Sequence, residues 1–395
     1  MAGVDAPTLL TGRVVTPGGV VDDGAVLLEG DRIAWVGPRS EVRAPEASTP
    51  RDWGAGRTLL PGLVDLHCHG GAGGEFGPDA DSARTAAAHH LRHGTTSLVA
   101  SLVSAPGPDL VAGAAACAPL VAEGVLAGVH LEGPFLSVAR CGAQDPAALI
   151  DPDPALVDAV VAAGAGGVVQ MTFAPERQGA DALMAQLAAA RAVPAVGHTD
   201  ADAADTRAAL DRILTLGARG GRPLVTHVFN GMPPLHHRSP GPVAAALASA
   251  GRSEAVLEVI GDGVHLAAET VRMLFETVGP DSLALITDSM AASGMPEGRY
   301  SLGGRDVVVE GRTARLASGG SIAGGVATLL DVVRWCVSDV GVPLADAVVA
   351  ASRTPAAVMG WAEVGALEAG RRADLLVVDD ALEPVRVLRA GTWLP

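Results

Sequence analysis

Short apolar runs alternate with longer Ala-rich segments through the central part of the chain. Eight of these runs have the length of strands, at 63–67, 95–103, 125–131, 167–173, 193–197, 223–228, 255–261 and 282–287. Segments with helical spacing lie between or after them, at 82–93, 109–122, 180–191, 201–216, 267–278 and 323–340. Because strands that alternate with helices form parallel sheets covered by those helices, the pattern predicts an α/β fold. Eight such units between residues 61 and 360 predict a closed (β/α)8 TIM barrel.

An open, doubly wound sheet is the alternative architecture. Such a sheet often opens its first helix with a G-x-G-x-x-G turn. The Gly-rich stretch at 70–74 lacks that spacing. We therefore favour the barrel, and we expect 70–74 to form a flexible loop over a site.

The two ends of the chain have a different sequence pattern from the middle, because they lack the alternation of strands and helices. Strand-like segments at 8–15, 25–29 and 32–36 are separated by Gly- and Asp-rich turns, and similar segments return at 370–379 and 385–388. We predict that both termini join in one small β-sandwich domain. The expected boundaries are 1–60 and 361–395 for the two parts of this domain and 61–360 for the barrel.

Composition and charge narrow the function classes. The net charge of −16 argues against general binding to nucleic acid or to anionic membranes. The longest nearly apolar run, 110–122, is shorter than the ~20 residues that a membrane span needs. The N-terminus shows no secretion signal, and the four cysteines lack CxxC spacing. We therefore expect a cytoplasmic protein with reduced thiols.

The chain contains no lysine, because arginine alone accounts for all 28 basic residues. This absence excludes mechanisms that need a Schiff-base lysine or a P-loop lysine. It also excludes a carboxylated lysine as a bridge between two metal ions.

Polar residues follow most of the predicted barrel strands, where a barrel of this type places its active site. Five histidines and two carboxylates stand there: His67, His69, Glu132, His198, His227, His265 and Asp288. A single polar residue after a strand can simply face water, but this repetition predicts a metal centre. Imidazole and carboxylate without thiolate fit one or two divalent ions, with Zn²⁺ the first expectation and Fe²⁺, Mn²⁺ or Co²⁺ also suitable. Glu132 is the glutamate available to bridge two ions.

The remaining histidines and cysteines have simpler interpretations. We expect His89, His90 and His93 to be surface or packing residues of a helix, and Cys68 to face the helices. His236 and His237 lie in a loop, and a functional role for them stays open. Cys141 is interpreted as an ordinary loop thiol.

Six stretches carry a resemblance to a known family: 61–70, 130–135, 197–201, 226–234, 262–265 and 287–290. They resemble the amidohydrolase superfamily and, within it, the branch that deacetylates N-acetylglucosamine 6-phosphate. The most specific part combines His-Leu-Glu-Gly-Pro at 130–134 with Thr-His-x-Phe-Asn-x-Met at 226–232. Other branches typically bridge their metals with a carboxylated lysine on strand 4, whereas Glu132 fits the deacetylase branch.

The resemblance implies roles for individual residues. Glu132, His198 and His227 would hold the principal metal, and His67 and His69 would bind a second ion where two are kept. Asp288 would be the catalytic acid/base, with His265 near the acetyl group of the substrate. The implied substrate contacts are Ala143, Gln144, Asn230, Gly231 and Arg238. The arginine would reach in from a neighbouring subunit, which implies a homodimer acting on a phosphorylated amino sugar in amino-sugar catabolism.

Gln144 is the one departure from the family pattern, which has a histidine in contact with the substrate at this position. Glutamine can donate and accept hydrogen bonds, but it cannot become cationic beside a phosphate. A related hydrolase for another N-acyl compound, such as N-acetylgalactosamine 6-phosphate, is therefore an alternative. A barrel that has lost its metal and serves as a binding scaffold is a second one.

Overall fold

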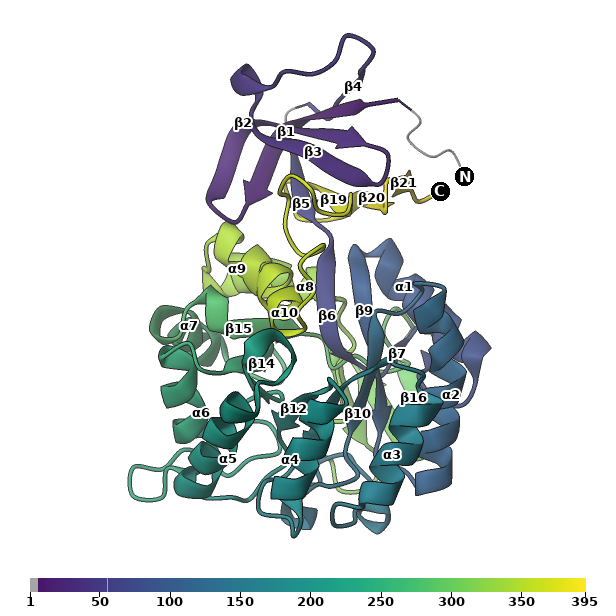
Figure 1. Ribbon diagram of the computed structural model, residues 1–395, viewed down its shortest axis with the longest axis vertical. Helices are drawn as coiled ribbons and strands as arrows, with labels where there is room; N and C mark the ends of the chain where they lie inside the picture. The colour runs from purple at the N-terminus through teal and green to yellow at the C-terminus, as the bar shows by residue number, and fades with distance from the viewer. Residues whose placement is uncertain (1–5, 55) are drawn as a thin grey trace.

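Eight parallel strands form a barrel in the middle of the chain (Figure 1). The computed structural model describes residues 6–54 and 56–395. In chain order, the barrel strands are β6 Leu63–Cys68, β9 Thr95–Val103, β10 Gly128–Glu132, β11 Val168–Phe173, β12 Val193–Val196, β13 Leu224–Val225, β14 Val256–Ile260 and β15 Leu283–Ile286. Each pairs with the next, and the ring closes where the amide of Asp288 donates to the carbonyl of His67 at 2.9 Å. The predicted fold class is confirmed.

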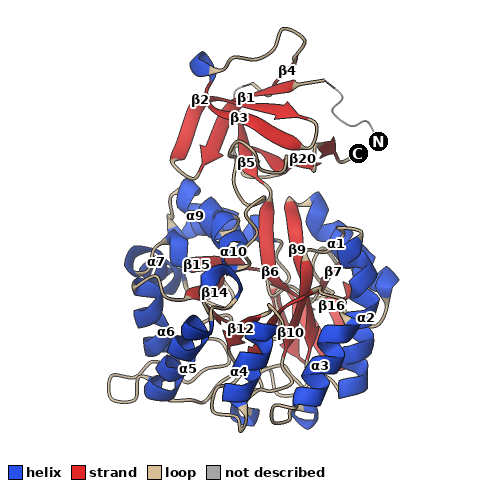
Figure 2. Ribbon diagram, in the orientation of Figure 1, coloured by secondary structure: helices blue, strands red, loops and turns tan. Residues whose placement is uncertain are grey.

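Helices cover the outside of the barrel, as Figure 2 shows in blue. They are α1 Ala80–Arg92, α2 Gly107–Ala122, α3 Pro154–Ala163, α4 Ala180–Ala189, α5 Ala203–Leu216, α6 Gly241–Gly251, α7 Ala268–Thr277 and α8 Leu329–Trp335. The side chains of Asp79, Asp153 and Asp202 accept backbone N–H groups at the starts of α1, α3 and α5. Such caps satisfy donors that a helix leaves unpaired.

The helix predicted at 323–340 is only partly correct. The α-helix begins after Thr328, which caps it together with Asp331, and residues 336–340 continue as a π-helix. The preceding segment stays non-helical because Gly324 has a positive φ of 73° and the amide of Gly325 bonds to the carbonyl of Asp288. Helices α3 and α6, in which alanine is the most frequent residue, also lie outside the predicted helical segments.

The predicted flexible loop at 70–74 is wrong. Strands β7 Gly70–Gly71 and β8 Gly74–Glu75 pair in a short antiparallel ladder. Gly70 is required by close packing, because a Cβ there would lie 2.3 Å from the carbonyl oxygen of Gly74.

A three-stranded antiparallel sheet is inserted after β15. It is formed by β16 Gly298–Leu302, β17 Arg305–Glu310 and β18 Thr313–Leu316. This insertion was not predicted.

The two termini share a second sheet at one end of the barrel (Figure 1). Its strands are β1 Thr8–Thr16, β2 Gly19–Glu29, β3 Arg32–Pro38, β4 Thr49–Asp52, β5 Arg57–Pro61, β19 Leu375–Asp379, β20 Pro384–Arg389 and β21 Thr392–Trp393. β19 pairs with β5 and so joins the end of the chain to its beginning. Leu10, Leu28, Leu59 and Leu375 lie in one core, which both termini therefore build.

Short helices connect the barrel to this sheet. They are α9 Leu344–Ala350 and α10 Arg353–Val358, and α9 lies against β1 and β2. Within 6–54 and 56–395, none of the helices combines the length and the apolar character that crossing a membrane demands.

Candidate metal centre

Two histidines come from strand β6 and its end. Successive side chains of a strand point to opposite faces, so His67 and His69 face the same way, and their Nε2 atoms lie 3.1 Å apart. The Nδ1 of His67 is 3.1 Å from Oε2 of Glu258, and the Nδ1 of His69 is 3.0 Å from the carbonyl oxygen of Ser101. These oxygens accept the Nδ1–H of each ring, so both Nε2 atoms face the centre of the barrel mouth as possible ligand atoms.

Two further histidines come from the opposite side, after strands β12 and β13. His198 has φ 47° and His227 has φ 26°, conformations that L residues rarely adopt. The predicted strand 223–228 is therefore too long, because the chain leaves the sheet before His227. The Nε2 atoms of the two rings lie 3.1 Å apart, and the Nδ1 of His198 is 2.7 Å from the carbonyl oxygen of Arg140.

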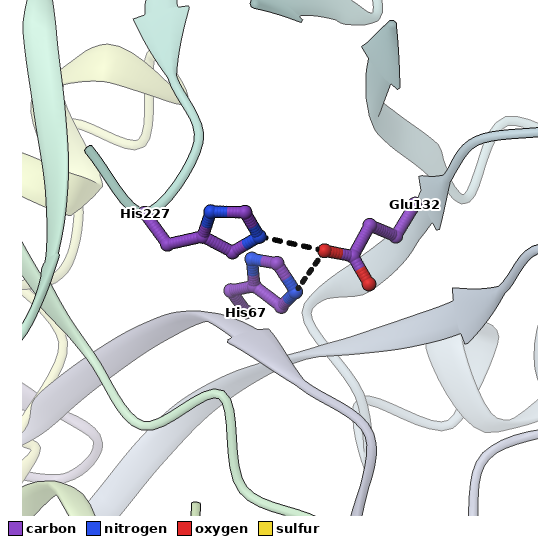
Figure 3. A group of neighbouring side chains, drawn as sticks. All are labelled: His67, Glu132 and His227. Carbon is purple, nitrogen blue, oxygen red and sulfur yellow. Dashed lines mark hydrogen bonds and ion pairs between the residues drawn. The ribbon is translucent and has the colours of Figure 1, made fainter. Parts of the chain in front are cut away.

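Glu132, at the end of β10, lies among all four rings. Its Oε1 is 2.8 Å from Nε2 of His227 and 2.9 Å from Nε2 of His198. Figure 3 shows His67 and His227 directed at this carboxylate, with His67 Nε2 at 3.5 Å from Oε1. His69 approaches the other oxygen, Oε2, at 3.1 Å.

Asp288 completes the cluster from the end of β15. Its Oδ1 lies 3.2 Å from Nε2 of His69 and 3.5 Å from Nε2 of His67. Two overlapping sets of ligand atoms are close enough to hold an ion: His67, Glu132 and His227, and His67, His69 and Asp288. The cluster is almost completely buried.

The charges in this cluster call for a cation. Burial opposes a charge on His69, but Asp288 and Glu132 outweigh it and raise the pKa of His69 to about 9. Burial also opposes a charge on His67, but the negative charge of Glu132 outweighs it. The pKa of His67 is therefore well above the usual range. Burial also works against ionised Glu132, yet the charge of His67 and its other histidine neighbours hold its pKa well below normal. A divalent cation supplies this positive charge without protons, so the donor set fits a metal ion.

A cavity of about 330 Å³ opens above the cluster. Of the residues predicted for the site, the following line it: His69, Glu132, Ala143, Gln144, His198, His227, Asn230, Gly231, His265 and Asp288. His67 lies beneath, with no exposed surface. Arg238 is exposed and does not line this cavity within the same chain.

Gln144 contacts one candidate metal ligand, Glu132, directly. Its side-chain amide donates to Oε2 of Glu132, and its Oε1 accepts from the backbone N–H of Ser104 at 2.8 Å. The inserted sheet holds this loop, because the guanidinium of Arg305 donates to the carbonyls of Ala143 and Gln144 at 3.1 and 2.8 Å. Arg305 was missed by the sequence reasoning.

His265 is oriented by Asp262. Its Nδ1 lies 2.8 Å from Oδ2 of Asp262, whose Oδ1 accepts the backbone N–H groups of Val264 and His265. Burial lowers the pKa of His265, but the hydrogen bond to Asp262 outweighs it and raises the pKa above the usual value. The spacing D-x-x-H carried this signal in the sequence.

His89, His90, His130 and Cys68 have packing roles. His90 lies 2.9 Å from the carbonyl of Gly70 and 3.2 Å from the sulfur of Cys68, which therefore faces helix α1 as predicted. His89 is buried against Ser293. His130 lies between Ser101 and Thr172 inside the barrel.

Glu258 is the most informative residue that sequence reasoning missed. It lies inside β14 with no exposed surface. A carboxylate within the apolar run 255–261 was a usable signal, because an isolated buried charge is expensive.

Known proteins match the chain over nearly its full length. The Amidohydrolase family matches residues 58–394. N-acetylglucosamine-6-phosphate deacetylase of Bacillus subtilis (strain 168) is 32% identical over 391 residues, which cover 96% of this chain and 94% of that protein. N-acetylgalactosamine-6-phosphate deacetylase of Escherichia coli O157:H7 is 34% identical over 385 residues, with coverage of 96% and 97%.

A solved structure gives the same picture in three dimensions. A mutant of N-acetyl-D-glucosamine-6-phosphate deacetylase from Mycobacterium smegmatis, in complex with N-acetyl-D-glucosamine 6-phosphate, superposes with a TM-score of 0.90. It is 43% identical in sequence, and the match covers 98% of this chain and 99% of that one. The chain therefore belongs to the amidohydrolase family.

Proposed function

We propose that this protein hydrolyses the acetamide bond of N-acetylglucosamine 6-phosphate, releasing acetate and glucosamine 6-phosphate. The observation that carries the proposal is the convergence of four imidazoles on Glu132, with Asp288 beside them at the floor of the cavity. The full-length similarity to deacetylases that are named for this substrate supports the choice of sugar.

We assign the metal to two adjoining positions. Glu132, His198 and His227 would hold the principal ion, and His67, His69 and Asp288 would surround a second position. The nitrogen and oxygen donors suit Zn²⁺, Fe²⁺, Mn²⁺ or Co²⁺. A divalent ion here would contribute Lewis acidity and a hydrolytic water whose pKa is lowered to about 7.

Asp288 would move the protons of the reaction. Burial works against its ionisation, but the hydrogen bond from His69 outweighs it and lowers its pKa to about 2. At neutral pH the carboxylate is therefore ready to accept a proton from the attacking water. The same oxygen would deliver that proton to the departing amine nitrogen.

His265 would stabilise the negative oxygen of the tetrahedral intermediate. Its Nδ1–H is committed to Asp262, so its Nε2 can donate a hydrogen bond only when the ring is an imidazolium. The raised pKa of His265 favours that form. The imidazolium would therefore act as a charged donor to the oxyanion.

The upper part of the cavity would bind the sugar phosphate. Ala143, Gln144, Asn230 and Gly231 line it. Arg238 would arrive from a second subunit, and its guanidinium would bind the phosphate. The proposed assembly is accordingly a homodimer with shared active sites.

Acetate release from purified, metal-loaded protein tests the reaction. We expect the highest kcat/KM for N-acetylglucosamine 6-phosphate and a large loss when the phosphate is absent. N-acetylgalactosamine 6-phosphate belongs in the panel because Gln144 replaces the family histidine and one relative is named for that sugar. No acetate from the first sugar, with turnover of another amide, would refute the proposal.

Mixing two inactive variants tests the shared site. Arg238→Ala removes the phosphate contact supplied to the neighbour, and Asp288→Asn removes the proton carrier of the subunit's own site. If the sites are shared, a mixed dimer has one site with both residues intact, so mixing should restore activity. A mixture as inactive as its parents would place Arg238 outside the neighbouring site.

A further inference from the structure

Glu258 is a fully buried carboxylate in the interior of the barrel, below the metal centre. Its Oε2 lies 3.1 Å from Nδ1 of His67, and its Oε1 accepts the side-chain amide of Gln170 at 2.6 Å. The backbone N–H of His227 approaches Oε2 at 3.4 Å. Within the described part of the chain, His67 is the only ion-pair partner of Glu258.

A buried carboxylate costs several kcal/mol unless a positive charge and hydrogen bonds compensate it. No arginine provides that charge to Glu258 in residues 6–54 and 56–395. The positive charge that compensates Glu258 must therefore come through His67, either from a proton or from a cation bound at Nε2 of that ring. The cost of burying Glu258 is therefore tied to the centre above it.

We infer that Glu258 is a positioning residue, which fixes the tautomer and orientation of His67 and thereby sets how tightly the centre retains its metal. The carboxylate keeps the proton of His67 on Nδ1, which leaves Nε2 free as a ligand atom. Gln170 binds the second carboxylate oxygen and prevents Glu258 from rotating away.

This inference rests on the proposed metal binding, and the experiment separates the two. Metal content is measured by elemental analysis as a chelator is titrated into the wild type, Glu258→Gln, His67→Ala and the double variant. Glu258→Gln keeps the shape of the side chain but removes the charge, so we expect about 10- to 100-fold weaker retention. Wild-type protein that binds no metal would refute the proposed function itself.

The double variant gives the decisive comparison. If Glu258 acts through His67, Glu258→Gln should not weaken retention further once His67 is alanine. Equal affinity of Glu258→Gln and the wild type would overturn the inference. Additive losses in the double variant would overturn it as well.

A charge-swapped variant controls for the possibility that Glu258→Gln disturbs folding. Glu258→Gln combined with Gln170→Glu preserves one carboxylate, one amide and the hydrogen bond between them. Thermal unfolding of the metal-free protein should then resemble the wild type, while metal retention should stay below the wild type, because the amide oxygen at position 258 accepts the Nδ1–H of His67 without the negative charge that strengthens the histidine as a ligand. Wild-type retention in the swapped protein would contradict the inference.

Discussion

The two sides of the metal centre are built in different ways. His67 and His69 lie on and just after a regular strand, and each Nδ1 has an oxygen acceptor. His198 and His227 lie in loops at positive φ, and the Nδ1 of His227 has no partner within 6–54 and 56–395. The strand pair therefore owes its geometry to strand alternation, whereas the loop pair depends on its surroundings to hold an uncommon backbone.

The two pairs should therefore differ in how they respond to substitutions around them. Backbone strain at a functional site persists only while the surrounding structure over-determines it. Changes around the loop pair should therefore propagate into metal binding, whereas the strand pair should respond mainly to loss of its hydrogen-bond acceptors.

Asp288 lies against the strand pair, and its substitution should have the largest effect. Asp288→Asn keeps the shape but cannot accept a proton, so we expect kcat to fall by about 10²- to 10⁴-fold. Substrate binding should survive, as measured by calorimetry. Near-normal kcat would remove Asp288 from the proton transfers.

The two sides can be compared directly by single truncations. His198→Ala removes a proposed ligand of the principal ion and should lower kcat by at least about 100-fold, more than the loss of a residue that only orients a metal ligand usually costs. His69→Ala should cost less, roughly tenfold, because it affects the second position. Steady-state kinetics with metal analysis measure both. A larger loss in His69→Ala would reverse the assignment of the principal ion.

The pH dependence tests His265, which belongs to neither pair and is oriented by the carboxylate of Asp262. Asp262 and Asp288 act on the charge of His265, and Arg312 donates to the carbonyl of Asp262. Because its folded pKa is raised, the stabilising imidazolium is fully present below about 6.5 and is lost as pH rises through the folded value. Activity should fall as the pH rises through this folded pKa of His265.

Asp262→Asn removes the carboxylate that raises the pKa of His265, whereas the burial that lowers this pKa remains. The pKa of His265 should therefore drop. The basic limb of kcat/KM against pH should then move to lower pH. Asp211→Asn, an exposed carboxylate on α5, is the control and should leave the profile unchanged. An unmoved limb in Asp262→Asn would exclude His265 as its source.

The smallest effect concerns the support of the loop pair. Gly231 has φ 61°, and a Cβ there would lie 2.9 Å from Nδ1 of His198. Gly241 has nearly the same φ, 63°, but its Cβ would lie 3.8 Å from its nearest neighbour. Alanine at either position should cost about 1–3 kcal/mol of stability from the backbone alone, measured by denaturant unfolding.

Metal retention separates these two glycines. Only Gly231→Ala should weaken metal retention, because only at this position would the new Cβ displace His198. Equal retention in both variants would mean that His198 does not depend on the packing beneath it.

Much of the centre could be predicted because residues at the ends of parallel strands converge by topology alone. The positions of His67, Glu132 and Asp288 follow from βα repetition once the barrel is assumed. The residues that support the candidate ligands could not be predicted, since Glu258 and Gln170 reach each other from strands that are not neighbours. The inserted sheet and its Arg305 were also missed, because neither belongs to the repeating unit.

Periodicity and residue type are local properties of the chain, and they were enough to predict the barrel, the union of both termini and the candidate ligands. The ring nitrogen that each histidine directs at the centre depends on acceptors far away in the chain, so it became clear only in three dimensions. The tertiary structure also decided that His198 and His227 adopt positive φ and that 70–74 is a packed ladder. In each case the cause is a contact between distant segments, which no local pattern contains.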